Sequence, residues 1–404
     1  MSPSATSNQK AQLPLPDADG DFYMVSQTLA KEDNELRLKV RSFMEREVAP
    51  VITDFWERDE FPFELLPKFK TLNIMGLPFQ GYGCPGRTTT LCGFVMMELA
   101  RVDASISTFF GVHTGLAMGS IYVCGSEEQK QKWLPKMAAM EKIGSFGLTE
   151  PDVGSGAAGG LATTAKREGD TWILNGQKKW IGNSTWGDLT IIWARDVDDG
   201  QVKGFIVENK TPGFHVDKIL HKMALRVVQN GLITLKDCRV SEADRLQNAN
   251  SFKDTASVLR QTRASVAWES VGCATGAYEH ALRYAQRRKQ FGKPIASFQL
   301  VQDLLFRMLC NITSTQALCL RLSQLQDHGL MRDEHASLAK GVCTARMRET
   351  VGWARELLGA NGILLDQQVG RFVADSEALY SYEGTREMNA LIVGKAITGF
   401  SAFV

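Results

Sequence analysis

The sequence has no excess charge of either sign and no long hydrophobic run. It holds 46 Lys and Arg residues against 45 Asp and Glu, which leaves a net charge of +1. A nucleic-acid-binding surface needs a basic face or stripe, so we expect no nucleic-acid partner. A membrane span needs about 20 consecutive apolar residues, and no such run stands out, so we expect no membrane insertion.

The cysteine and histidine patterns of metal sites are also missing. The eight cysteines form no Cys-x-x-Cys pair, and the six histidines are scattered. We therefore expect no metal, and we interpret the cysteines as small buried side chains in a reducing compartment. The first 15 residues lack the apolar core of a signal peptide, and the last residues form no peroxisomal address, so we expect a cytoplasmic protein.

The chain has 404 residues, which is more than one hydrophobic core usually supports. Its hydrophobic periodicity divides it into a tail and three zones. Residues 1–26 predict a flexible tail, and residues 27–143 predict a helical domain. Residues 144–252 change to short β-rich runs separated by turn residues, which predicts an antiparallel β-barrel or sandwich. Residues 253–404 hold long amphipathic stretches, which predict a helical bundle. The expected fold class is α+β multidomain.

The pattern also predicts individual elements. We expect helices over 103–118, 127–140, 258–286, 298–328 and 334–358, and strands over 172–174, 189–194, 204–207 and 232–235. The string Gly81-Tyr82-Gly83-Cys84-Pro85-Gly86 matches a dinucleotide fingerprint. It follows no clear strand, and Pro85 stands where the helix would open, so we do not assign a cofactor site to it.

The segment Tyr382-Glu383-Gly384-Thr385 carries the strongest chemical signal. It places a carboxylate between an aromatic ring and a glycine, just after a helix-like run. A ring can desolvate a carboxyl group and raise its pKa, and glycine lets a ligand approach the backbone closely. A carboxylate made basic in this way can take a proton from carbon near neutral pH, although an ordinary solvated Glu is the alternative.

Further segments have the chemistry of a cofactor site. Residues 287–293 place clustered cations at a helix end, which suits a pyrophosphate or simply the helix dipole. Residues 356–363 close a helix with two glycines, which suits phosphate binding or an ordinary helix stop. The turn at 148–155 could hold the edge of a planar ring, and Trp180 could stack on a cofactor or fill the core.

In their order along the chain, and over about residues 27–403, these segments resemble the acyl-CoA dehydrogenase and acyl-CoA oxidase superfamily. The resemblance implies a helical N-terminal domain, a β domain and a C-terminal four-helix bundle. It also implies FAD as the cofactor, an acyl-CoA substrate and a homotetramer in which a neighbouring subunit completes each FAD site. The sequence is most similar to glutaryl-CoA dehydrogenase and to the plant short-chain acyl-CoA oxidase.

By this resemblance Glu383 is the catalytic base, which removes the α-proton of the thioester while the β-hydrogen leaves as hydride to flavin N5. The backbone N–H of Glu383 and a flavin ribityl hydroxyl would hold the thioester oxygen. Some members carry the base on another helix, at the position of Thr262 here, which cannot serve as a base.

The resemblance also assigns binding roles. The residues expected to bind FAD are Leu148, Thr149, Trp180, Arg288, Gln290, Phe291, Gln299, Glu356, Gly359, Gly362, Thr385 and Glu387, and those expected at the substrate are Ser107, Ser155 and Arg263.

Two departures from the family pattern bear on function. Ser107 stands where the glutaryl enzyme has an Arg for the distal carboxylate of its substrate, so we expect an uncharged and short acyl chain beside Phe109 and Phe110. Gly182 stands where many dehydrogenases have a Thr or Ser at flavin N5.

The electron acceptor therefore stays open between an electron-transfer flavoprotein and oxygen, which would make the protein an oxidase that releases hydrogen peroxide. Two further alternatives are a nucleic-acid-binding relative without catalysis and an oxidase of a carbon acid that is not a thioester.

Overall fold

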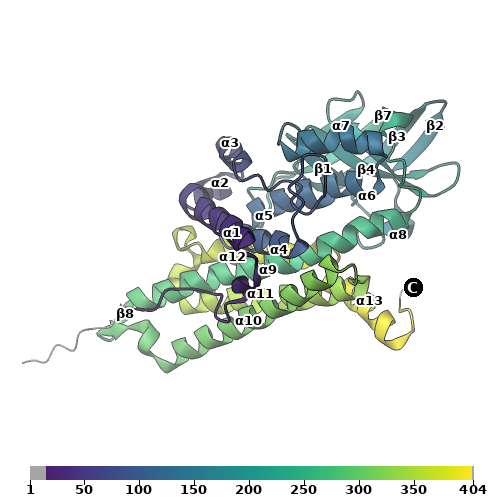
Figure 1. The fold of residues 1–404 in the computed structure, drawn as a ribbon. Coiled ribbons are helices and arrows are strands. Elements are labelled where there is room, and N and C mark those ends of the chain that lie inside the picture. Colours follow the sequence, from purple (N-terminus) through teal and green to yellow (C-terminus); the bar gives the residue numbers. More distant parts are fainter. Residues whose placement is uncertain (1–14, 403–404) are drawn as a thin grey trace, which may run out of the picture.

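The computed structural model describes residues 15–402, which form a helical domain, a β domain and a helical bundle (Figure 1). The first domain contains η1 Val25–Thr28, α1 Lys31–Phe43, η2 Met44–Val48, α2 Ile52–Arg58, η3 Phe63–Leu65, α3 Leu66–Lys70, α4 Thr89–Ala100, α5 Ala104–Phe110, η4 Gly111–Met118, α6 Gly119–Cys124 and α7 Glu127–Ala138. Ser126 begins α7 with a capping box that Gln129 completes. The part of the predicted tail that is described lies against α9 Phe252–Arg287, where Gln286 Nε2 donates to Pro16 O at 3.0 Å.

One expectation about hydrophobic runs is wrong. The consecutive elements α5, η4 and α6 form one helical run, Ala104–Cys124, that is long and apolar enough to cross a membrane by length and composition alone. Within the described residues 61% of its apolar window is buried, and the run contacts β1 Gly144–Gly147 and α9. Its apolar character therefore reflects, for the larger part of the run, packing against other elements of the protein.

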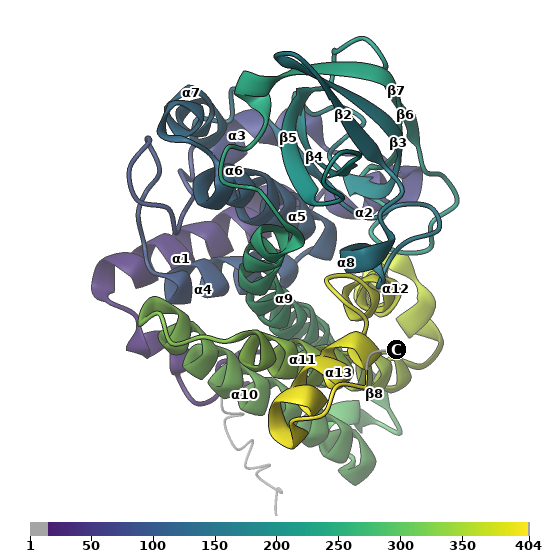
Figure 2. The same cartoon turned by 90° about the vertical axis from the view of Figure 1, so that its right-hand side faces the viewer.

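The β domain is one seven-stranded sheet (Figure 2). Its elements are β1, α8 Ala157–Gly160, β2 Thr164–Glu168, β3 Thr171–Gly182, β4 Leu189–Asp196, β5 Val202–Glu208, β6 Phe214–Lys218, β7 Asn230–Ser241 and η5 Glu242–Asp244. The strand order is β1-β4-β2-β3-β7-β6, with β5 paired to β4. Most pairs are antiparallel, as expected, whereas β4 pairs in parallel with β1 and β2.

The third domain is a bundle of long helices. It contains α9, β8 Lys289–Gln290, β9 Lys293–Pro294, η6 Ile295–Ser297, α10 Gln299–Asp327, α11 Asp333–Leu357, η7 Gly359–Ile363, η8 Leu365–Gln367, α12 Val369–Ser381 and α13 Arg386–Thr398. Helix α9 lies at the centre of the molecule and contacts α4, α10, α11 and α12 (Figure 2). The predicted fold class and the three long bundle helices are confirmed.

Buried ion pairs fix the first domain against the bundle. Arg101 Nη1 at the end of α4 lies 2.6 Å from Glu279 Oε2 on α9, and Asp103 Oδ2 lies 2.6 Å from Arg371 Nη1 on α12. All four side chains are almost fully buried. Because a buried charge that loses its partner is costly, these pairs hold α5, α9 and α12 in one arrangement. The candidate active site lies between these three helices.

Candidate active site

The turn between α12 and α13 carries Glu383 in a strained backbone conformation. Helix α12 ends at Ser381, Glu383 has φ of 54°, and Gly384 follows with φ of 86°. Thr385 then begins α13 by accepting a hydrogen bond from Met388 N at 3.3 Å. A non-glycine residue in the left-handed region costs about 1–2 kcal/mol, and such strain clusters at functional sites.

Helix α9 supplies the hydrogen-bond partner of this carboxyl group. Thr262 Oγ1 donates to Glu383 Oε2 at 2.8 Å. Burial raises the pKa of Glu383, while the bond from Thr262 and the charges of Arg263 and Lys340 act in the opposite direction. The net shift is upward, which suits a group that must take up a proton near neutral pH.

A second carboxyl group lies beside the first and was missed in the sequence. Glu269, two turns along α9 from Thr262, is 1% exposed, and it accepts from Tyr382 Oη at 2.6 Å and from Thr108 Oγ1 at 2.9 Å. Burial raises the pKa of Glu269 to about 7, although the hydroxyls of Tyr382, Thr108 and Ser107 favour its charged form. The signal that could have revealed it is a lone acid within the apolar stretch 264–274.

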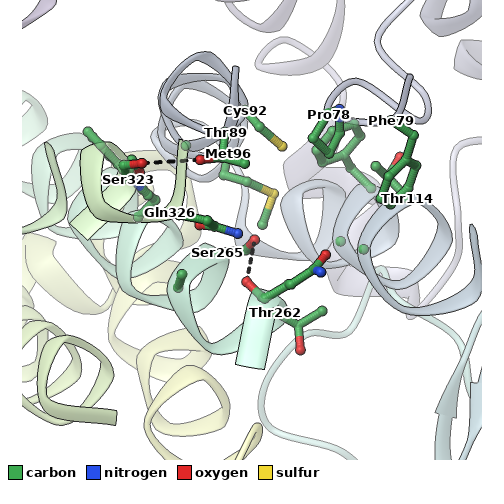
Figure 3. A pocket seen from close by; sticks show the side chains of 17 residues that line it. Pro78, Phe79, Thr89, Cys92, Met96, Thr114, Thr262, Ser265, Ser323 and Gln326 are labelled. Atoms are coloured by element: carbon green, nitrogen blue, oxygen red, sulfur yellow. Dashed lines mark hydrogen bonds between the residues drawn. The ribbon is translucent and has the colours of Figure 1, made fainter. Parts of the chain in front are cut away.

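A small cavity of about 50 Å³ lies beside Thr262, between α4, η4 and α9 (Figure 3). Trp268 limits its size, because its ring lies where a Cβ on Gly93 would stand and its Nε1 donates to Ser323 Oγ at 2.8 Å. Phe110 lines the cavity, whereas Phe109 packs with Phe61, Phe69 and Trp186 in a separate aromatic cluster. The expectation that both phenylalanines shape the pocket therefore applies to Phe110.

The remaining predicted substrate residues lie at different depths. Ser107 is fully buried on α5, where its Oγ donates to Met96 O at 3.3 Å. Arg263 faces the neighbourhood of Glu383, and its buried Nε has no protein partner among the described residues. An orphaned guanidinium N–H is suited to an anionic ligand. Ser155 lies in an exposed turn before α8.

The segment Leu148–Glu150 is held by the neighbouring strand β3. Lys179 N donates to Thr149 O at 2.8 Å, and Lys178 Nζ donates to Leu148 O at 3.0 Å and to Glu150 Oε1 at 2.8 Å. Burial lowers the pKa of Lys178 to about 8. Two residues after Lys178 in β3, Trp180 is 53% exposed and has φ of 68°. Its ring is therefore available to a planar ligand.

The other predicted cofactor residues surround a cavity of about 750 Å³ at the far end of the bundle, near β8 (Figure 1). Among its lining residues are Arg288, Gln290, Phe291, Gln299, Glu356 and Gly359, and Gly362 lies in the adjoining η7. The Phe291 ring is 91% exposed, and the space beside Gly359, with φ of 60°, is open. A guanidinium, an exposed ring and accessible backbone form a surface that suits a dinucleotide.

The predicted cofactor residues thus fall into two separate groups. Leu148, Thr149 and Trp180 lie in the β domain, and Thr385 and Glu387 follow Glu383 at the start of α13. The residues of the far cavity form the second group. Thr262 contacts Glu383, and Arg288 ends the same helix 26 residues later, which is about 39 Å along its axis. One chain therefore does not bring the two groups together.

Comparison with known proteins agrees with this architecture. Models of the acyl-CoA dehydrogenase N-terminal, middle and C-terminal domains match residues 30–141, 145–238 and 252–398. An acyl-CoA dehydrogenase of Bacillus subtilis (strain 168) is 33% identical over 92% of this chain and 99% of its own. The caffeyl-CoA reductase-Etf complex subunit CarC of Acetobacterium woodii is 31% identical over 90% of this chain and 97% of its own.

Solved structures agree as well. Glutaryl-CoA dehydrogenase from Mycobacterium smegmatis superimposes with a TM-score of 0.92 at 38% identity, over 96% of this chain and all of that one. A structure of a glutaryl-CoA dehydrogenase from the same organism in complex with FADH2 gives a TM-score of 0.93 at 35% identity, with the same coverage. The chain belongs to the acyl-CoA dehydrogenase family, and it is an FAD-dependent enzyme that dehydrogenates acyl-CoA thioesters.

Proposed function

We propose that this enzyme desaturates acyl-CoA thioesters with a short, uncharged acyl chain between the α and β carbons, with Glu383 as the base. The observation that carries the proposal is the hydrogen bond from Thr262 to Glu383 at the edge of a cavity of about 50 Å³. An engineered cavity of about 150 Å³ holds one benzene molecule, so a third of that volume suits only a few carbons.

The residues of this chain have distinct roles in the proposed reaction. The Glu383 carboxylate takes the α-proton, and the bond from Thr262 orients it. The backbone N–H of Glu383 is the donor for the thioester oxygen, on which negative charge develops. Arg263 binds the anionic CoA part. Bound FAD supplies the two-electron oxidant.

The neighbourhood of Ser107 favours an uncharged chain. Glu269, which accepts hydrogen bonds only from hydroxyls among the described residues, lies beside Ser107 and titrates near neutral pH. A distal carboxylate on the substrate would therefore meet a like charge in place of a cation. We propose that this enzyme differs in this respect from an enzyme that accepts glutaryl-CoA.

We also propose that a second copy of the chain completes each FAD site. Thr262, which contacts Glu383, and Arg288 are about 39 Å apart along α9, and Phe291 beside the far cavity is 91% exposed. A second subunit, within the homotetramer expected from the sequence, would bring its Arg288 group to the Glu383 group of the first.

For the electron acceptor we propose an electron-transfer flavoprotein, because a relative with 31% identity is named as a subunit of an Etf complex. Oxygen is the second candidate, and Gly182 favours it. A Cβ at Gly182 would lie 3.3 Å from Val112 Cγ2, so the backbone there leaves no room for a side chain beside the expected ring position without adjustment. Stopped-flow mixing of substrate-reduced enzyme with air separates the two: flavin reoxidation at turnover speed rejects the electron-transfer flavoprotein as the required acceptor, and slow reoxidation rejects oxygen.

The acyl specificity is tested by anaerobic bleaching of the bound flavin. Saturated CoA esters from propionyl to palmitoyl, together with glutaryl-CoA, are mixed with parent enzyme and with Glu383→Gln. We expect bleaching by the short esters only, and none in the variant, which should keep its yellow flavin. Faster bleaching by glutaryl-CoA than by butyryl-CoA contradicts the proposed chain, and bleaching of Glu383→Gln at the parent rate contradicts the proposed base.

The shared site is tested by subunit complementation. Arg288→Ala removes the cation of the far cavity, and Glu383→Gln removes the base. If each site combines groups from two copies, co-expressed variants assemble some sites with an intact Arg288 and an intact Glu383, and activity returns to about a quarter of the parent value. Activity no higher than that of the separate variants contradicts the shared site.

A further inference from the structure

We propose that Lys340 is a positioning residue for the base: it holds the turn that carries Glu383 and supplies the buried positive charge that favours its carboxylate form. This inference rests on the proposed function of Glu383. Lys340 lies on α11 and is 0% exposed. No step of the mechanism described above uses it.

The hydrogen bonds of Lys340 bracket the base. Its Nζ donates to Tyr380 O at 2.8 Å and to Gly384 O at 2.7 Å, so one ammonium group joins the last turn of α12 to the residue after Glu383. Gly384 O also accepts from Asn389 Nδ2 at 2.9 Å. Both bonded carbonyls flank the left-handed Glu383, whose strained conformation must be stabilised from outside the turn.

The chemistry of the position requires a cation. Tyr380 O is one of the last carbonyls of α12, where the helix dipole is negative, and a lysine there complements it. Burial lowers the pKa of Lys340 to about 8, so the charged form predominates at neutral pH. A fully buried ammonium persists only when it has partners, and the two carbonyls and the nearby Glu383 carboxylate serve as these.

Several charged groups face Glu383, and Lys340 is the one that also shapes its turn. From α9, Arg263 favours the carboxylate, whereas Glu269, when ionised, opposes it. From the end of α12, the phenol of Tyr382 donates to Glu269 and stays protonated, because burial raises its pKa. From α13, the carboxylate of Glu387 acts on Lys340 and favours its charged form. Removal of the Lys340 charge therefore leaves Arg263 as the one remaining cation in the described part of the chain, together with the hydrogen bond from Thr262, against burial and Glu269.

The test measures proton removal separately from oxidation. The holoenzyme is incubated in D2O with acetyl-CoA, which has no β-carbon. The α C–H bond breaks, the proton passes to Glu383, and a deuteron from the solvent-exchanged carboxyl returns to the same carbon without any change in redox state. Proton NMR gives the exchange rate between pH 5 and 9, and its midpoint reports the pKa of the base.

Lys340→Met keeps the length of the side chain and removes its charge and donors. We expect the midpoint of exchange to move up by about one pH unit and the rate at pH 6 to fall about tenfold or more. Lys340→Arg keeps the charge and should keep the midpoint near the parent value. Asn389→Leu removes the other hydrogen bond to Gly384 O without a change in charge, so its rate should fall while its midpoint stays.

If the exchange rate of Lys340→Met has the same pH midpoint as that of the parent enzyme, the inference is overturned. A lysine with a merely structural role would lower the rate equally at every pH and leave the midpoint unchanged. If Lys340→Met does not accumulate as folded holoenzyme, Lys340→Gln takes its place, and a parental midpoint there has the same consequence. Absence of exchange in the parent enzyme instead rejects Glu383 as the base, so the two failures are distinguishable.

Discussion

Thr262 and Glu383 are joined by a hydrogen bond of 2.8 Å although 121 residues separate them in the chain. The bond runs from the middle of α9 to the turn after α12. By the family resemblance of the sequence, it connects the position at which some members are expected to carry their base with the position that carries the carboxylate here. The hydroxyl of Thr262 therefore acts on the carboxyl group of Glu383, to which it donates a hydrogen bond.

Removal of this hydroxyl should make the base less available at low pH. The bond from Thr262 lowers the pKa of Glu383, so Thr262→Val raises it, and fewer enzyme molecules hold a carboxylate at pH 6. A hydrogen bond to a charged group contributes about 1.5–3 kcal/mol, so flavin bleaching at pH 6 should slow by about tenfold and approach the parent rate near pH 9. Thr262→Ser keeps the donor and is the control. Equal rates of Thr262→Val and parent at pH 6 contradict the role of the hydroxyl.

A smaller residue in place of Trp268 should lengthen the acceptable acyl chain. Trp268 occupies the space next to Gly93 at the end of the small cavity. In Trp268→Phe, kcat/KM for octanoyl-CoA relative to butyryl-CoA should rise by about tenfold, with a loss of stability of about 1–3 kcal/mol. Trp193→Phe, a fully buried change in β4, should lose stability without a change in that ratio. If Trp268→Phe and Trp193→Phe have the same ratio of kcat/KM for octanoyl-CoA to that for butyryl-CoA, Trp268 does not limit the length of the acyl chain.

Glu269→Gln should stabilise the enzyme in alkaline more than in acidic solution. The pKa of Glu269 is about 7 in the folded protein and about 4.3 in an unfolded chain, so the folded state holds the extra proton between these values. Stability is therefore lost as the pH rises through this window, and the loss is complete above about pH 7. A glutamine does not ionise. The difference in free energy of unfolding between variant and parent should therefore be about 2–4 kcal/mol more favourable to the variant at pH 8 than at pH 5.

Thermal unfolding midpoints of parent and variant at pH 5 and pH 8 measure this difference. The exposed residue Glu64 offers a control, and Glu64→Gln should show no dependence of this kind. The prediction fails if the midpoint of Glu269→Gln relative to the parent is the same at both values of pH.

Lys178→Met should weaken FAD retention by releasing the segment that it holds. The change leaves Leu148 O without its donor and Glu150 with a buried charge, which costs about 3–5 kcal/mol. FAD content after gel filtration should fall, and Lys178→Met combined with Glu150→Gln should recover part of the stability because the isolated charge is gone. Lys166→Met, on the exposed side of β2, should retain FAD like the parent. Full retention in Lys178→Met would show that the ion pair does not support the cofactor segment.

The sequence was sufficient for the fold class and for the long helices. Apolar residues recur with a helical period through α9, α10 and α11, and each helix is too long to be mistaken for a strand. The short strands β1 and β6 and the helix α13 were not predicted. Strand β1 has only four residues, and Asn389 is the one fully buried residue of α13, so neither has the periodicity on which prediction depends.

The sequence by itself determined the candidates for the proposed chemistry, because the Tyr-Glu-Gly-Thr segment and the Thr at position 262 can be read without coordinates. Only the tertiary structure decided what surrounds them. Lys340 and Glu269 face the turn of Glu383 from α11 and α9, and the cavity beside Arg288 lies far from that turn, at the C-terminal end of α9. The physical reason is that proton affinity and ligand reach depend on distance and burial, which arise only when segments far apart in the chain pack against one another.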